Sequence, residues 1–146
     1  KASKAKTRAR GQDRPMRVVI RELPACRVAY MRHVGPYGAG GIPALWMRFR
    51  KWMSTRGLVE ADSLRIGIGH DDGWVTPPEK CRYDACVVLP PDFQGDRLVN
   101  VRELPGGRYA MSKYSGTADR IPQAWDVLYR SWLPDSGYEP EAFRRA

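Results

Sequence analysis

The sequence has few of the side chains on which metal binding and acid–base catalysis usually depend. It contains two histidines, His33 and His70, and its three cysteines include no CxxC pair. Two histidines leave little for histidine-based catalysis, and cysteines spaced in this way argue against a disulfide framework or a zinc site. We therefore expect a protein of a reducing, cytoplasmic setting, with no catalytic residues, no metal and no cofactor.

Long apolar runs and complete nucleotide-binding motifs are also missing. No run approaches the roughly 20 apolar residues of a membrane-spanning helix, so we expect no membrane partner. The segment GIGHDDG at 67–73 lacks the third glycine of a dinucleotide fingerprint, and no Walker lysine occurs. We interpret Asp71-Asp72-Gly73 as a turn, and contact between one of its carboxylates and a ligand as the alternative.

The sequence contains an internal duplication. The segment IRELPACRVAYMRHVG at 20–35 is answered by VRELPGGRYAMSKYSG at 101–116, and IPALW at 42–46 is answered by IPQAW at 121–125. A period of about 80 residues exceeds the 20 to 50 residues of solenoid repeats, which indicates two fused half-domains. We expect the first repeat at about 16–90 and the second at about 96–146.

Each copy begins with an extended pattern and continues with a helical one. Residues 16–22 and 27–34 are rich in strand-forming side chains around a Leu-Pro-Ala turn and are predicted to form a hairpin. From Ile42 the apolar spacing becomes helical, with Gly57 at the end of the helix. The second copy repeats this spacing from Ile121 to Trp132, where Pro134 with Gly137 is predicted to end the helix.

These elements predict an α+β fold. Further strands are expected at 63–70 and 83–89, so that each unit reads strand, strand, helix and then further strands. We expect the two units to be related by a pseudo-twofold axis, with antiparallel sheets, two helices on one side and a central ligand cleft on the other.

The net charge of +9 is concentrated at the start of the chain. Residues 1–15 carry six basic side chains against one acidic side chain and show no apolar periodicity, which is typical of a flexible linker. Contact between this tail and nucleic acid is the alternative. Because the chain begins with lysine, we expect it to be a fragment of a longer protein, with a single domain at 16–146.

Aromatic residues fall at positions where a core does not need them. Tyr37 follows Gly-Pro, Trp74 lies in a polar loop and Tyr83 begins a strand. Aromatic walls with a few carboxylates suit flat or cationic organic ligands. We predict that Tyr37, Trp74, Tyr83, Tyr114 and Asp72 bind a ligand, whereas ordinary packing is the alternative for each aromatic side chain.

Five stretches carry a family resemblance: VGPYG, IPALW, HDDGWVTPPEKCRYDACV, LPGGRYA and GTADRIPQAWDVLYRSWLPDSGYEP. Together they resemble the GyrI-like small-molecule-binding domain over about residues 16–140. That domain follows helix-turn-helix regions in AraC-type bacterial transcription regulators and also occurs as a standalone protein. The resemblance implies a cleft that binds small amphipathic or cationic molecules as effectors. Family members usually continue into a strand that bears a cleft-facing glutamate, for which Glu141 is the candidate here.

The resemblance implies an effector-binding domain that reaches DNA only through a separate helix-turn-helix domain, of which this sequence has no signature. Two alternatives stay open. One is a standalone domain that binds and inhibits another protein, as the gyrase-inhibitor branch does. The other is a small-molecule hydrolase of the same fold that uses a tyrosine and a glutamate. The identity and charge of the ligand, and the oligomeric state, do not follow from the sequence.

Overall fold

The structure, a computed structural model, describes residues 17–38, 40–58 and 63–140. The chain divides into two compact units, one of residues 22–107 and the other of residues 1–21 with 108–146. The basic tail predicted to be a linker and the predicted ligand residue Glu141 lie outside the described residues. Antiparallel sheets combined with helices confirm the predicted α+β class.

A four-stranded sheet in the order β3-β4-β2-β5 forms the unit of residues 22–107. Its strands are antiparallel neighbours and are joined by loops, the helix α2 and the short 3₁₀ helix η1. The bounds of these elements are β2 Cys26–Val34, α2 Gly41–Thr55, β3 Arg65–Gly69, η1 Pro78–Lys80, β4 Arg82–Val88 and β5 Asn100–Leu104.

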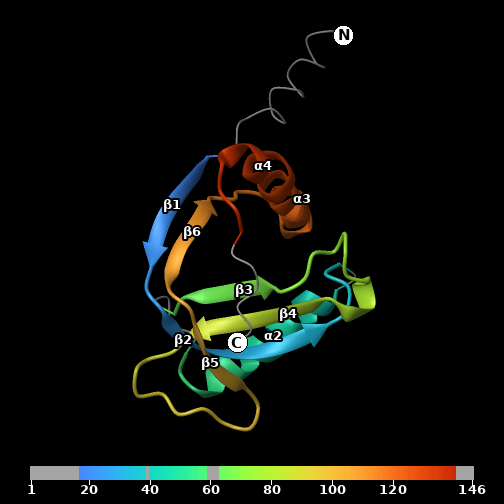
Figure 1. The fold of residues 1–146 in the computed structure, drawn as a ribbon. Helices are drawn as coiled ribbons and strands as arrows, with labels where there is room; N and C mark the ends of the chain where they lie inside the picture. Colours follow the sequence, from blue (N-terminus) through green and yellow to red (C-terminus); the bar gives the residue numbers. More distant parts are fainter. Residues whose placement is uncertain (1–16, 39, 59–62, 141–146) are drawn as a thin grey trace. The chain divides into compact units, whose positions relative to one another are not determined.

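Helix α2 covers one face of this sheet (Figure 1). It forms where the apolar spacing predicts it, and Gly57 follows its end with a left-handed φ of 69°, as expected of a glycine beyond a helix terminus. Leu45, Phe49 and Met53, which the spacing places on the core side, are fully buried. The helical prediction is therefore confirmed.

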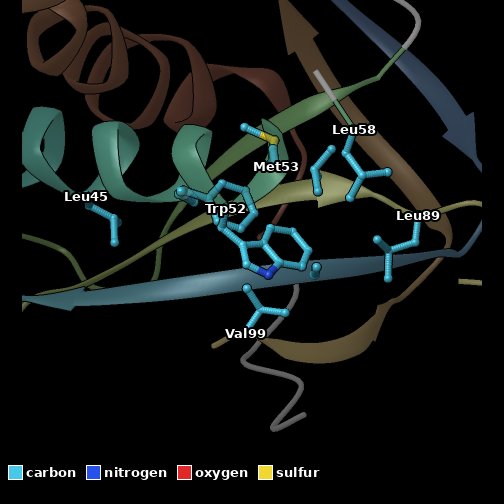
Figure 2. Close-up of a cluster of buried hydrophobic side chains, with 10 residues drawn as sticks. Leu45, Trp52, Met53, Leu58, Leu89 and Val99 are labelled. Carbon is cyan, nitrogen blue, oxygen red and sulfur yellow. The ribbon is translucent and has the colours of Figure 1, made fainter. Parts of the chain in front are cut away.

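The hydrophobic core lies between α2 and the sheet (Figure 2). It contains Ala29, Leu45, Phe49, Trp52, Met53, Leu58, Ala85, Val87, Leu89 and Val99. Trp52, which the helical spacing did not single out, stacks on Phe49 with ring centroids 5.6 Å apart. Its indole N–H donates a 2.8 Å hydrogen bond to the Asp96 carboxylate, so the polar atom of this buried ring has a partner.

The predicted hairpin at residues 16–34 is wrong. Strand β1 (Val18–Leu23) does not pair with β2 but forms a two-stranded sheet with β6 (Gly107–Ser112), while β2 pairs with β4 and β5. A tight hairpin needs a turn with positive φ, which the Leu-Pro-Ala junction does not favour because proline fixes φ near −65°. The first strand of each copy thus pairs with the second strand of the other copy, and each unit combines strands from both copies.

The helical segment of the other unit includes Pro134 and ends at Ser136. It comprises η2 (Ala118–Arg120), α3 (Ile121–Asp126), the π-helical η3 (Val127–Trp132) and α4 (Leu133–Ser136). Pro134 lies inside it, as the second residue of α4. Gly137, with φ of 78°, ends the helix as predicted.

Gly106 lies so close to the backbone of residues 23–25 that a Cβ atom does not fit there. Gly106 stands where the first copy has Ala25, and a Cβ atom on Gly106 would lie 2.7 Å from the Ala25 nitrogen and 2.9 Å from the Leu23 oxygen. Both neighbours are backbone atoms, which move only with the strands themselves. A side chain at this position therefore forces β2 and β5 apart.

We predict that Gly106→Ala lowers the free energy of unfolding by about 1–3 kcal/mol, the usual cost of overpacking. Gly73→Ala is the matched control, because a Cβ atom there meets nothing within 4 Å. Urea denaturation of both variants measures the difference. Equal midpoints for the two variants would show that the backbone contact at Gly106 does not constrain the sheet.

Candidate functional site

The face of the four-stranded sheet that α2 does not cover carries a polar cluster. Strand pairing sets Arg32 opposite Asp84, Tyr30 opposite Cys86 and Val28 opposite Arg102. Because side chains alternate between the faces of a strand, these six residues share one face, and Ala29, Ala85 and Val87 share the face under α2. We call the six residues, together with His70 just after β3, the polar face.

Asp84 is the centre of the polar face. Its side chain is fully buried, and the Arg32 guanidinium donates two hydrogen bonds to it, from Nε at 2.8 Å and from Nη2 at 3.0 Å. His70 Nε2 lies 2.6 Å from Oδ2 of the same carboxylate. Burial favours the protonated acid, but the hydrogen bonds from Arg32 and His70 outweigh it and hold the pKa of Asp84 below its usual range. The carboxylate is therefore ionised at neutral pH, and His70 Nε2 is the donor.

Arg102 approaches the same carboxylate without bonding to it. Its Nη2 lies 3.8 Å from Asp84 Oδ2, beyond hydrogen-bond distance, and its Nε is buried with no hydrogen-bond partner. The guanidinium lies over the Tyr30 ring at 5.0 Å from the centroid, and the Arg32 guanidinium lies 5.8 Å from the same centroid. The Tyr30 ring therefore has two guanidiniums near it, and Asp84 is the carboxylate that both of them approach.

The cysteine on the polar face is not prepared for nucleophilic chemistry. Cys86 is fully buried, and burial raises the pKa of its thiol to about 12. Burial also raises the pKa of Cys81, at the start of β4. Thiols in this state are protonated at neutral pH and act as small apolar side chains.

Two of the sequence-predicted ligand residues meet on the other face of the sheet. The rings of Tyr37 and Tyr83 pack edge to face with centroids 6.4 Å apart. The Tyr83 hydroxyl accepts a 3.0 Å hydrogen bond from the Trp46 indole of α2. A Cβ atom on Gly67 would lie 2.0 Å from that hydroxyl, so the glycine of β3 leaves room for the Tyr83 ring. Burial raises the pKa of both tyrosines.

The remaining predicted residues lie elsewhere. Asp72 Oδ1 accepts a 2.9 Å hydrogen bond from the Trp74 backbone N–H, which forms the expected turn, and the Trp74 side chain is 72% exposed. Tyr114 belongs to the other unit, where its hydroxyl donates to the Thr117 carbonyl at 2.6 Å. The structure thus brings Tyr37 together with Tyr83, and Asp72 together with Trp74.

Sequence reasoning missed the polar face. The sequence contained one sign of it, the single acid Asp84 between Tyr83 and the apolar run ACVV. A charged group in an apolar strand needs polar partners, so its position indicated a buried cluster. Its partners come from β2, β5 and the end of β3, and no spacing in the sequence relates those positions. In residues 17–38, 40–58 and 63–140, three or more His, Cys, Asp or Glu side chains never gather closely enough to hold a metal ion. In the same ranges, no helix is both long enough and apolar enough to span a membrane.

Comparison with known proteins identifies the family. The family model described as "GyrI-like small molecule binding domain" matches residues 16–144, and the chain belongs to this family. It is 39% identical to YosT of Bacillus subtilis (strain 168), a prophage-derived protein whose name describes it as a transcriptional regulator, over 78% of this chain and 76% of YosT. It is 35% identical to YgiV of Escherichia coli (strain K12), also named as a transcriptional regulator, over 68% of this chain and 61% of YgiV.

Solved structures support the same fold. The chain matches the C-terminal domain of EcmrR with a TM-score of 0.68 and 17% identity, over 86% of this chain and 79% of that domain. It also matches EcmrR in a complex with DNA, with a TM-score of 0.69, 17% identity and coverage of 94% of this chain. The match covers 52% of that EcmrR chain, so the longer protein has a substantial part with no counterpart here.

We predict that Asp84→Asn lowers the free energy of unfolding by about 3 kcal/mol at pH 7, because it leaves the Arg32 cation without its charged partner. The folded-state pKa of Asp84 is depressed, so its contribution is complete above the unfolded pKa of about 3.9 and is lost as the pH falls through the folded value. The variant should therefore lose less stability between pH 5 and pH 2 than the wild type does.

Urea denaturation across this pH range tests the prediction. Asp92→Asn, which changes an exposed acid in the loop after β4, serves as the control. If Asp84→Asn and Asp92→Asn have the same stability at pH 7, the buried carboxylate does not support the sheet as described.

Proposed function

We propose that this chain is the effector-binding domain of a bacterial, cytoplasmic transcription regulator of the AraC type, and that it binds a small amphipathic organic molecule. The observation that carries the proposal is the family match, which spans residues 16–144 and describes a small-molecule-binding domain. The regulator names of YosT and YgiV, and the EcmrR complex with DNA, support a role in transcription. DNA contact would belong to a separate helix-turn-helix domain, as the partial coverage of EcmrR favours.

The structure supports binding more than catalysis. The hydroxyl of Tyr37 accepts a hydrogen bond from the Asp71 N–H at 3.0 Å and lies 2.8 Å from the Arg82 carbonyl, so the backbone already occupies it. Burial raises the pKa of Tyr37 and Tyr83, which makes either tyrosine a poor general base at neutral pH. The protonated thiols of Cys81 and Cys86 are likewise poor nucleophiles. We therefore favour a sensor over a hydrolase.

Among the residues predicted from the sequence, Trp74 is the best placed to reach a ligand from solvent. Its indole is large and 72% exposed, and its loop is fixed by the Asp72 turn. Tyr37, Tyr83, Asp72, Tyr114 and Glu141 remain proposed ligand contacts. Tyr37 and Tyr83 pack on the side of the sheet that α2 covers, so we propose that they act on the ligand indirectly: Tyr37 hydrogen-bonds to the backbone at the ends of β3 and β4, and Tyr83 hydrogen-bonds to Trp46 of α2.

A thermal-shift screen against cationic, neutral and anionic amphipathic molecules tests the proposal. A ligand present at 100 times its dissociation constant stabilises the folded state by about 2.7 kcal/mol, which raises the midpoint by about 8–10 °C for a chain of this length. We expect saturable hits in the low-molecular-weight panel. A panel without hits would contradict the effector-binding function.

We predict that Trp74→Ala weakens binding of the strongest hit about tenfold while changing the free energy of unfolding by less than 0.5 kcal/mol. Isothermal titration calorimetry measures the affinity. Val75→Ala is the control, because Val75 is 81% exposed in the same loop. Equal affinities for the two variants would remove Trp74 from the ligand contacts.

A second candidate function is suggested by the DNA gyrase inhibitor of Escherichia coli (strain K12), which is 29% identical over 60% of this chain. A domain of this second kind would bind gyrase itself. A DNA supercoiling assay with purified gyrase separates the two functions. We expect no inhibition by this chain, and inhibition at stoichiometric concentrations would favour the second function.

A further inference from the structure

We infer that the polar face binds the anionic group of an organic acid, with Arg102 and Arg32 as its cationic partners and Tyr30 as its aromatic wall. The inference rests on the proposed effector-binding function and deepens it by assigning the charge of the ligand. The family resemblance implied amphipathic or cationic ligands, whereas this inference assigns an anionic ligand. Tyr30, Arg32, Asp84 and Arg102 all belong to the unit of residues 22–107.

The sheet places Asp84, Tyr30 and Arg102 on one diagonal across three neighbouring strands. Tyr30 lies on the central strand β2, which Asp84 of β4 flanks on one side and Arg102 of β5 flanks on the other. The Arg102 side chain crosses the Tyr30 ring toward Asp84 and stops 3.8 Å short of it. The guanidinium is therefore held over an aromatic surface, and its buried Nε lacks the hydrogen bond that a buried donor normally makes.

The Asp84 carboxylate is already saturated by other donors. Its Oδ1 accepts from Arg32 Nε, and its Oδ2 accepts from both Arg32 Nη2 and His70 Nε2. Arg102 Nε is left buried with no hydrogen-bond partner. A buried donor without a partner is costly, and an oxyanion is the group that satisfies a guanidinium best, through two parallel N–H···O bonds.

Charge counting favours the same ligand. The two guanidiniums face a single carboxylate, so the cluster carries a net positive charge even with a neutral His70. The side chains of Arg32 and Arg102 are 34% and 18% exposed, so solvent reaches both. An organic cation placed here would meet like charges, whereas an acid with an aromatic body would lie on Tyr30 and extend its carboxylate to the arginines.

Titration of the full chain with benzoate, benzamide and benzylamine tests the inference, because these probes have similar shape but anionic, neutral and cationic head groups. Nitrogen-15 NMR spectra are recorded in low-salt buffer without phosphate, since phosphate would compete. We expect benzoate to bind saturably and to shift the Arg102 Nε–H resonance, with at least tenfold weaker binding of benzamide and benzylamine. Inorganic phosphate, titrated separately, distinguishes a general oxyanion site from one that needs the aromatic body.

Arg102→Gln should weaken benzoate binding at least tenfold, and Arg102→Lys should weaken it less because the charge remains. Both variants should fold, since Arg102 makes no hydrogen bond to Asp84, and circular dichroism checks this. Arg50→Gln, which changes an exposed arginine of α2, should bind benzoate as the wild type does.

Different results contradict the anionic assignment and the effector-binding function. If benzylamine binds as tightly as benzoate, or if benzoate binds Arg102→Gln and Arg102→Lys as tightly as the wild type, the anionic assignment is overturned while the effector-binding function stands. Benzoate that does not bind at all also overturns the anionic assignment. If no molecule of the amphipathic panel binds the wild-type chain, the effector-binding function itself fails.

Discussion

The buried carboxylate of Asp84 is the interaction on which the polar face depends. It joins β4 to β2 through Arg32 and to the end of β3 through His70, and it attracts Arg102 of β5 across the Tyr30 ring. A charge buried in a sheet is costly unless donors surround it, so the Asp84 carboxylate favours the arrangement in which β2 and the end of β3 supply those donors.

The two faces of the sheet have different roles as a result. Under α2, apolar packing around Phe49 and Trp52 stabilises the unit, and the Trp52–Asp96 hydrogen bond satisfies the polar atom of the buried indole. On the polar face, the same sheet displays charged side chains at fixed spacing. A rigid apolar layer behind a charged layer is the arrangement that presents a preorganised binding surface, because the side chains need little reordering when a ligand arrives.

The sequence predicted those features that depend on local spacing. Helix α2 follows from its apolar period, and the duplication was visible in the RELP segments at 21–24 and 102–105. Strand pairing was not predictable in this way, because the exchange of strands between the copies depends on contacts between residues far apart in the sequence. The Asp84 cluster depends on that exchange, so the residues of the polar face could not be grouped from the sequence.

Hydrogen–deuterium exchange of the full chain, with and without a saturating small-molecule ligand from the amphipathic panel, measures whether ligand binding acts on the sheet of residues 22–107. If it does, amide exchange in β2, β4 and β5 slows when the ligand is bound. Exchange that slows only in residues 108–140, with β2, β4 and β5 unchanged, would contradict it.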